Sequence, residues 1–311
     1  MSSHPPYLWL NGEIVPWESA TIHLVDARSL LTVSSVYEGI RGYWNPQHEQ
    51  LYVFRLPEHM RRFGDSMKVM RMQPAFDKEV LCQGVVELLR RNAPHGDVYI
   101  RPVGSFAPEA GNVTGDVDPK HLEVMIYANE RPSSLSQDRQ MNVAVSSWTR
   151  ISDNSMPPRV KSNANYLSSR LVAAQALSDG YDGAIILNAD GTVAEGPWAC
   201  VFIVRDGVVI TPSVTSNILE SITRRTVIQL AQEALGACVE QRAVARTELY
   251  VADEMFFCGT GAEVTPIVSV DRFKVGSGEV GPMTRRLRGL YYDIVRGMEP
   301  DYTNWLTPVY T

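Results

Sequence analysis

The stretch from Arg159 to Ser178 places a lysine directly before a helix-like segment, and this combination most constrains how the chain can fold. Apolar residues recur there at three- and four-residue spacing, namely Leu167, Leu171, Ala174 and Leu177. This spacing predicts a helix with an apolar face, capped by Asn163 or Asn165 and ended by Gly180. Lys161 would then lie just outside the helix start, where partial burial favours a neutral amine that can form a Schiff base. Taken alone, the pattern favours an ordinary solvated lysine, so other segments have to decide.

The composition indicates a globular chain and argues against several partners. A length of 311 residues suggests about two domains. The net charge is −6, and no basic run with interleaved aromatic residues occurs, so we expect no nucleic-acid partner. The longest apolar runs are too short to span a bilayer, and the N-terminal residues do not resemble a signal peptide, so we expect no membrane partner.

The cysteines and histidines are scattered. Cys82, Cys200, Cys238 and Cys258 form no C-x-x-C pair, and the six histidines form no H-E-x-x-H motif. This spacing favours reduced thiols and a cytoplasmic location, and it predicts no metal site.

The first half of the chain alternates short strands and helices. In residues 26–44, Tyr37, Arg41 and Tyr43 alternate and should share one face of a strand. Pro57 opens a helix with an apolar face, and Arg62 lies off that face, where the pattern alone predicts a solvated side chain. The strand from Asp97 to Val103 places Tyr99 and Arg101 on the same side. The polar run of residues 129–138 predicts a linker between two domains, residues 1–128 and 139–311.

The second half contains a carboxylate in an apolar setting and two candidate anion-binding turns. Glu195 lies among apolar neighbours in a strand meander, where a positively charged partner could hold it ionised. The helix from Leu219 to Gly236 begins at Ser221 or Ile222, and its first turn, with the Thr223 hydroxyl, suits a phosphate. The Gly259-Thr260-Gly261 backbone offers a second cluster of N–H groups.

One motif resembles a nucleotide-binding fingerprint without its context. Residues 276–281 spell G-x-G-x-x-G, but too little chain follows for the βαβ repeats of a dinucleotide-binding domain. We therefore expect a turn before a terminal helix and reject an NAD-linked oxidoreductase.

Together, a lysine at a helix start, a nearby tyrosine, a buried carboxylate and two anion-binding turns describe a pyridoxal 5′-phosphate (PLP) site. The order and spacing also resemble the fold-type IV PLP enzymes, the branched-chain and D-amino acid aminotransferase-like family. The resemblance covers nearly the whole chain and is densest from Lys161 to Pro266. It implies an α+β fold with two domains, a small N-terminal α/β domain and a larger domain that has a β-barrel-like core with flanking helices.

The resemblance implies a role for each matching residue of the cofactor site. Lys161 would form the Schiff base and carry the proton, Tyr166 would bond the phenolic oxygen, and Glu195 would pair with the pyridine nitrogen. Leu219 would pack on the ring. The residues implied for the phosphate are Arg62, Ile222, Thr223 and Thr260.

Within this family the motifs Y-E-G-I-R-G-Y and V-Y-I-R-P resemble those of branched-chain L-amino acid aminotransferases. The implied substrate residues are Tyr37, Gly39 and Tyr99 for the aliphatic side chain, Arg41 behind them, Arg101 for a distal carboxylate, and Gly261 and Ala262 for the α-carboxylate. The implied partners are an amino donor and a 2-oxo acid acceptor, exchanged by a ping-pong mechanism in at least a homodimer.

Two alternatives remain open from the sequence. Thr32 stands where the familiar bacterial enzymes have a tyrosine, so the chain could use D-amino acids or (R)-amines. An aminodeoxychorismate lyase resembles the same fold and uses the same lysine.

Overall fold

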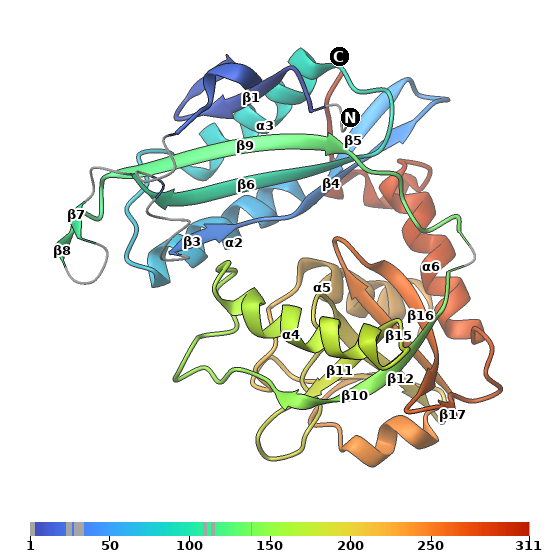
Figure 1. Ribbon diagram of the computed structural model, residues 1–311. Helices are drawn as coiled ribbons and strands as arrows, with labels where there is room; N and C mark the ends of the chain where they lie inside the picture. Colours follow the sequence, from blue (N-terminus) through green and yellow to red (C-terminus); the bar gives the residue numbers. More distant parts are fainter. Residues whose placement is uncertain are drawn as a thin grey trace. The chain divides into compact units, whose positions relative to one another are not determined.

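The computed structural model describes residues 4–22, 27, 34–107, 111–112, 116–137 and 139–310, in two compact units (Figure 1). Unit 1 comprises residues 1–133, 160–164 and 294–311, and unit 2 comprises residues 134–159 and 165–293. The change from unit 1 to unit 2 after Ser133 falls within the segment predicted as a linker. The predicted domain boundaries treat each domain as one continuous stretch, whereas unit 1 also takes in two later segments; the boundaries themselves stay a prediction.

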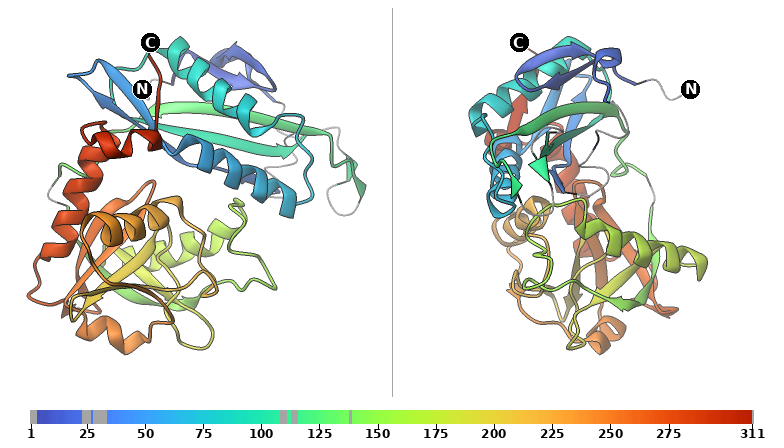
Figure 2. Two further views of the ribbon diagram at one scale, coloured as in Figure 1. Left: turned by 180° about the vertical axis from the view of Figure 1, so that it is seen from behind. Right: turned by 60° about the vertical axis from the view of Figure 1, so that its left-hand side comes forward.

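Unit 1 is an antiparallel sheet with helices on one face (Figure 2). The strand order is β18-β5-β4-β6-β9-β1-β2, and β3 also pairs with β6. Its strands are β1 (Tyr7–Leu10), β2 (Glu13–Pro16), β3 (Ser35–Tyr37), β4 (Ile40–Asn45), β5 (Gln50–Phe54), β6 (Val98–Phe106), β9 (Leu122–Glu130) and β18 (Leu306–Pro308). Its helices are α2 (Leu56–Val69) and α3 (Lys78–Asn92), with short turns of 3-10 helix at Trp17–Ser19 and Pro300–Trp305, and β7 (Gly111–Asn112) pairs with β8 (Asp116–Val117).

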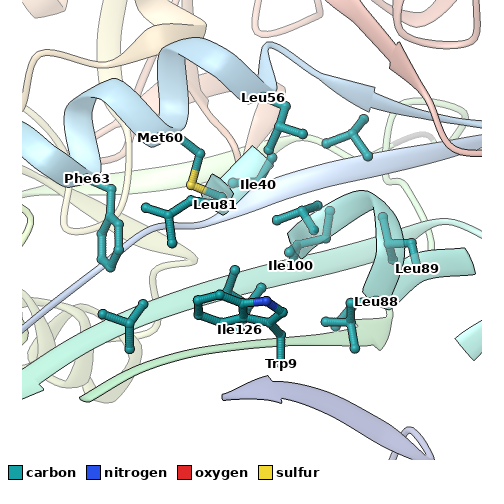
Figure 3. Packing of buried hydrophobic residues seen from close by; sticks show 14 of the residues in the cluster. Trp9, Ile40, Leu56, Met60, Phe63, Leu81, Leu88, Leu89, Ile100 and Ile126 are labelled. Atoms are coloured by element: carbon teal, nitrogen blue, oxygen red, sulfur yellow. The ribbon is translucent and has the colours of Figure 1, made fainter. Parts of the chain in front are cut away.

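The helices and the sheet of unit 1 share an apolar core (Figure 3). Met60, Phe63 and Met67 of α2 are buried, so the predicted apolar face of this helix is confirmed. They pack with Leu81, Leu88 and Leu89 of α3 against Ile40, Ile100 and Ile126 of the sheet. Burying each such side chain contributes about 1.5–3 kcal/mol, and this core fixes α2 against the strands that carry site residues.

Residues near the C-terminus complete the sheet of unit 1. Strand β18 pairs with β5, and the side chain of Gln50 bonds the backbone of Val309 and Tyr310, 260 residues away in the case of Tyr310. No local pattern in the sequence predicts this pairing, because β5 and β18 lie far apart in the chain.

Unit 2 is built on a curled, mixed sheet of half-barrel form in the order β11-β10-β16-β15-β12-β13-β14, with β17 pairing with β16. The strands are β10 (Met141–Thr149), β11 (Gly183–Leu187), β12 (Cys200–Arg205), β13 (Val208–Thr211), β14 (Val239–Gln241), β15 (Glu254–Gly259), β16 (Glu263–Val270) and β17 (Phe273–Lys274). The helices are α4 (Asn165–Ser178), α5 (Ile222–Gln229), continued by a π-turn at Leu230–Ala234, and α6 (Pro282–Val295), with a 3-10 turn at Arg246–Val251. Apolar side chains of the sheet, among them Val143, Ile203 and Met255, form the core.

Helix α4 forms where the sequence predicts it, but its predicted apolar face is not the face that packs on the sheet. Leu167, Leu171 and Leu177 are 59%, 46% and 65% exposed. The buried positions are Asn165, Ser169, Val172 and Ala176, on the side of the helix that contacts β10 and β11. Small side chains on this face let the helix approach the sheet closely, so the leucine repeat points to the opposite side.

The G-x-G-x-x-G segment ends in the predicted turn before a terminal helix. Gly281 precedes α6, and a Cβ at this position would lie within 2.4 Å of the Glu254 carboxylate. That carboxylate accepts hydrogen bonds from the backbone N–H of Met283 and Thr284 (2.9 and 2.8 Å) and from the Thr284 hydroxyl (2.7 Å). Gly281 therefore makes room for a carboxylate that caps the first turn of α6.

We predict that Gly281→Ala destabilises the protein by about 1–3 kcal/mol, because the new methyl group displaces Glu254 from the helix N-terminus. Gly289→Ala within α6 is the control, since a Cβ there meets no atom within 4 Å. Alanine in an exposed helix position is expected to stabilise by up to about 1 kcal/mol. Thermal unfolding of both variants measures the difference, and equal midpoints would contradict the assignment.

Candidate active site

Lys161 is held on strand β3 of unit 1 by hydrogen bonds from both sides. Tyr37 N–H donates to the Lys161 carbonyl (2.9 Å), and Asn163 N–H donates to the Ser35 carbonyl (3.0 Å). The Lys161 N–H donates to the Ser66 hydroxyl of α2 (3.1 Å). Its Nζ lies 4.7 Å from the centre of the Tyr37 ring, and the residue is half-buried. A lysine fixed in this way is not the solvated surface charge that its local pattern favours.

A buried carboxylate follows directly after strand β3, next to the tyrosine that holds Lys161. Glu38 is fully buried and accepts hydrogen bonds from Arg62 Nε (2.7 Å) and Nη2 (2.8 Å). Its Oε2 also lies 2.8 Å from Nδ1 of the buried His59. Arg62 is thus paired with a carboxylate through two nitrogens, and its pattern-based prediction as a solvated side chain is wrong.

The charges of Glu38 and Arg62 set the protonation state of the cluster formed by Glu38, His59 and Arg62. Burial alone would raise the pKa of the Glu38 carboxyl, but Arg62 and the His59 hydrogen bond outweigh it and leave that pKa well below its ordinary value. Burial lowers the pKa of His59, helped by the positive charges of Arg62 and Lys161 and opposed by Glu38. The cluster therefore holds an ionised carboxylate at neutral pH.

We predict that Glu38→Gln costs about 3–5 kcal/mol of unfolding free energy at pH 7, because it leaves the Arg62 guanidinium without its carboxylate. The unfolded Glu38 takes up its proton near pH 4.5, whereas the folded carboxyl stays ionised to lower pH. Stability from Glu38 is therefore complete above this pH and is lost as the pH falls further. Denaturant unfolding at pH 7 and pH 4 should show the difference between wild type and variant shrinking at pH 4.

A control is Glu240→Gln. Glu240 pairs with Arg242 at 2.9 Å and the two side chains are 48% and 39% exposed, so its loss should cost at most about 1 kcal/mol. An equal cost for both variants would contradict a special role for Glu38.

Five of the seven residues expected to contact substrate belong to unit 1, as Lys161 does, and Gly261 and Ala262 belong to unit 2. Gly39 packs against Tyr99 so closely that a Cβ would lie 2.0 Å from the tyrosine oxygen. The Arg101 guanidinium lies 4.3 Å from the centre of the Tyr37 ring, the same ring that the Lys161 amine approaches. Arg41 is buried behind them and donates to the Arg131 carbonyl at 3.0 Å. The strands thus bring these side chains together as a group.

Unit 2 holds the second carboxylate. Glu195 is buried, and its Oε1 lies 2.6 Å from Nη2 of Arg150. The Leu219 N–H approaches both carboxylate oxygens at 3.3 Å, and the Cys200 thiol lies 3.6 Å from Oε2. Arg150 also donates to the Asn217 carbonyl at 3.0 Å, which fixes its guanidinium. The positively charged partner anticipated for Glu195 is therefore Arg150.

The two predicted anion-binding turns also belong to unit 2. The Ser221 hydroxyl caps α5 by accepting from Arg224 N–H (3.1 Å), and Ile222 and Thr223 follow, both buried. Thr260, Gly261 and Ala262 form the half-buried turn between β15 and β16. Helix N-termini and turns of this kind present N–H groups to an anion.

Tyr166 lies in the first turn of α4 and is half-buried. Its ring is stacked on Trp198 with 5.6 Å between ring centres. The candidate residues thus form two groups, one in each unit, and Thr32 lies outside the described residues.

Sequence reasoning missed four of the residues that shape these groups: Glu38, His59, Arg150 and Trp198. An acidic residue inside an apolar strand segment, as Glu38 is, signals a buried carboxylate that needs a partner. Its partners Arg62 and His59 lie three residues apart on one helix, and no spacing rule connects that helix to the strand before the fold is known.

The residues present fit pyridoxal 5′-phosphate. Lys161 supplies an amine for covalent attachment, and the Glu195 carboxylate, balanced by Arg150, suits a protonated ring nitrogen. The start of α5 and the Thr260 turn suit a phosphate. Among the described residues, no three His, Cys, Asp or Glu side chains are grouped as metal ligands. None of the helices in the described part of the chain is long and apolar enough to span a membrane.

Comparison with known proteins matches the chain over nearly its full length. The family model described as amino-transferase class IV matches residues 35–270. A probable branched-chain-amino-acid aminotransferase of Aquifex aeolicus is 41% identical, covering 98% of this chain and 97% of that protein. A branched-chain amino acid aminotransferase from Thermobaculum terrenum, solved in its PLP form, is 48% identical with a TM-score of 0.95, covering 99% of both chains. A branched-chain aminotransferase from Thermoproteus uzoniensis, solved with norvaline, is 40% identical with a TM-score of 0.90, covering 98% of this chain and 100% of that one.

Proposed function

Because this chain belongs to the amino-transferase class IV family, we propose that it is a PLP-dependent aminotransferase for branched-chain L-amino acids. It transfers the amino group of leucine, isoleucine or valine to 2-oxoglutarate or another 2-oxo acid. The observation that carries this function is the half-buried Lys161, fixed on β3 with its amine over the Tyr37 ring. The expected fold of the fold-type IV enzymes is confirmed by the solved relatives.

We assign the cofactor to the residues named from the sequence. Lys161 attaches it, Tyr166 bonds its phenolic oxygen, Glu195 pairs with its ring nitrogen, and Leu219 packs on the ring. Arg62, Ile222, Thr223 and Thr260 hold its phosphate. The Glu38–Arg62 pair supports this assignment, since a guanidinium fixed by a carboxylate is pre-organised for a second anion.

We assign the substrate to the group around Lys161 and to the β15–β16 turn. Tyr37, Gly39 and Tyr99 contact the aliphatic side chain, with Arg41 behind them. Arg101 meets the distal carboxylate of glutamate or 2-oxoglutarate. Gly261 and Ala262 donate to the α-carboxylate through their backbone.

The chemistry divides between cofactor and chain. When bound, the cofactor acts as an electron sink for the substrate α-carbon. Lys161 removes the α-proton as a base and returns it as an acid. The oxo acid made from the donor leaves before the acceptor binds, which gives ping-pong kinetics.

A donor titration tests this function. The PLP-loaded protein is mixed with L-leucine, L-glutamate, D-alanine or (R)-1-phenylethylamine, and the loss of the visible cofactor absorbance is followed. Fast conversion by L-leucine and L-glutamate, with little by the other two, supports the proposal. Preference for D-alanine or the (R)-amine would favour the alternative donor class, and no conversion by any donor would favour a lyase.

Lys161→Ala should abolish the lysine-linked absorbance and lower transamination of L-leucine at least about a hundredfold, because the proton carrier is lost. Lys68→Ala, an exposed lysine in the last turn of α2, is the control and should behave as wild type. Residual activity of Lys161→Ala near that of the control would refute the role of Lys161.

We further propose that the protein is at least a homodimer and that a second copy covers the exposed face of α4. Leu167, Leu171 and Leu177 lie on this face, while small and polar side chains face the protein's own sheet. Exposing this apolar face of α4 to water costs free energy until another apolar surface covers it. A cytoplasmic location is also proposed, and it rests on the scattered cysteines alone.

Leu171→Glu should raise the dissociation constant of the dimer more than about tenfold, because it places a charge in the contact. Val251→Glu is the matched control, since Val251 is 56% exposed on another part of unit 2. Sedimentation velocity over a concentration series measures both. A monomeric wild type, or a variant as dimeric as wild type, would refute this contact.

A further inference from the structure

Trp198 has no role in the assignments above, although it lies among the cofactor residues of unit 2. It is 55% exposed, yet its indole is stacked almost parallel on the Tyr166 ring, at an angle of 5° and with 5.6 Å between ring centres. Stacked rings attract each other and restrict each other's rotation. The pair joins the first turn of α4 to the segment before β12.

The backbone holds Trp198 in place from two directions. The Gly196 N–H donates to the Ala199 carbonyl at 2.8 Å and closes the turn that contains Trp198. On the other side, Gly259 packs so closely that a Cβ there would lie 3.3 Å from the Trp198 carbonyl oxygen. Trp198 therefore has Glu195 just before it in the chain and the start of the Thr260 turn against its backbone.

Tyr166 is the other member of the stacked pair. It is the second residue of α4, and its ring is only half-buried. A tyrosine near a helix start can rotate about two side-chain bonds, so its hydroxyl has no fixed direction unless neighbours restrict the ring. The broad, rigid face of Trp198 is one such neighbour.

We propose that Trp198 is a positioning residue that holds the Tyr166 ring so that its hydroxyl points to the phenolic oxygen of the cofactor. This inference rests on the proposed function, which gives Tyr166 that hydrogen bond. Trp198 acts through Tyr166 and takes no part in the proton transfer.

The hydrogen bond has a spectroscopic consequence. The Tyr166 hydroxyl donates to the phenolic oxygen and stabilises the negative charge there. Without this hydrogen bond, the charge on the phenolic oxygen holds the proton on the neighbouring nitrogen of Lys161 more strongly. Loosening the Tyr166 ring therefore raises the pH midpoint of the visible absorbance of the Lys161-bound cofactor. Losing one hydrogen bond to a charged oxygen corresponds to a rise of about one pH unit.

The test compares absorbance titrations of the PLP-loaded wild type with those of W198L, W198F, Y166F and the double variant W198L/Y166F. We expect Y166F and W198L to raise the midpoint, W198F to raise it less because it keeps a ring, and the double variant to match Y166F. W148L is the control, since Trp148 is 49% exposed in the same unit and has no ring partner among the described residues. It should leave the midpoint unchanged.

A second measurement uses the cofactor-free protein. Near-ultraviolet circular dichroism should lose the same aromatic signal in W198L and in Y166F, because each removes one member of the stacked pair. It should retain this signal in W148L apart from the contribution of Trp148 itself. If W198L does not fold, the smaller shifts expected for W198F decide the question in both measurements.

The outcomes separate the two proposals. A raised midpoint in Y166F with a wild-type midpoint in W198L and W198F overturns the positioning role and leaves the function intact. Additive shifts in the double variant overturn it as well, because Trp198 would then act without Tyr166. A wild type that develops no visible absorbance with PLP overturns the proposed function, and the role of Trp198 with it.

Discussion

The pairing of residues 160–164 with strand β3 is the contact on which the candidate site depends. The chain leaves unit 2 after Arg159, forms backbone hydrogen bonds with Ser35 and Tyr37, and returns to unit 2 at Asn165. One short segment thereby fixes the position of Lys161 and leads directly into the residue that begins α4. Because backbone groups make these bonds, they fix the backbone of Lys161 and not the direction of its side chain.

Two buried ion pairs hold charged carboxylates among the candidate site residues. Glu38 is held by Arg62 in unit 1, and Glu195 by Arg150 in unit 2. A carboxylate buried without a partner would take up a proton, whereas a paired one stays charged and oriented. Each ion pair therefore orients its carboxylate before any ligand binds. The desolvation cost of that charge is incurred during folding.

Much of the fold and of the candidate site could be predicted from the sequence, because many of its signals are local. The α2 face, the start of α5 at Ser221, the turn before α6 and the order of motifs around Lys161 all depend on neighbouring residues. The α4 face could not be predicted, since the spacing of Leu167, Leu171 and Leu177 reports an apolar stripe and not what covers it. The partners of Glu38 and Glu195 were equally inaccessible, because Arg62 and Arg150 reach them only through the tertiary fold. The contact of Trp198 with Tyr166 could not be predicted either, because a single aromatic residue forms no repeating pattern in the sequence.

The pairing of β18 with β5 has a consequence for how the protein folds as it is synthesised. Gln50 in unit 1 cannot form its hydrogen bonds with Val309 and Tyr310 until these residues are synthesised. The β5 edge of the unit 1 sheet therefore stays unpaired while all of unit 2 emerges from the ribosome. Contacts of such long sequence separation form slowly and late, since a large loop must close first. All of unit 2 lies within that loop. The nascent chain therefore exposes an unpaired strand edge for most of its synthesis, a state in which pairing with another nascent chain competes with completion of its own sheet.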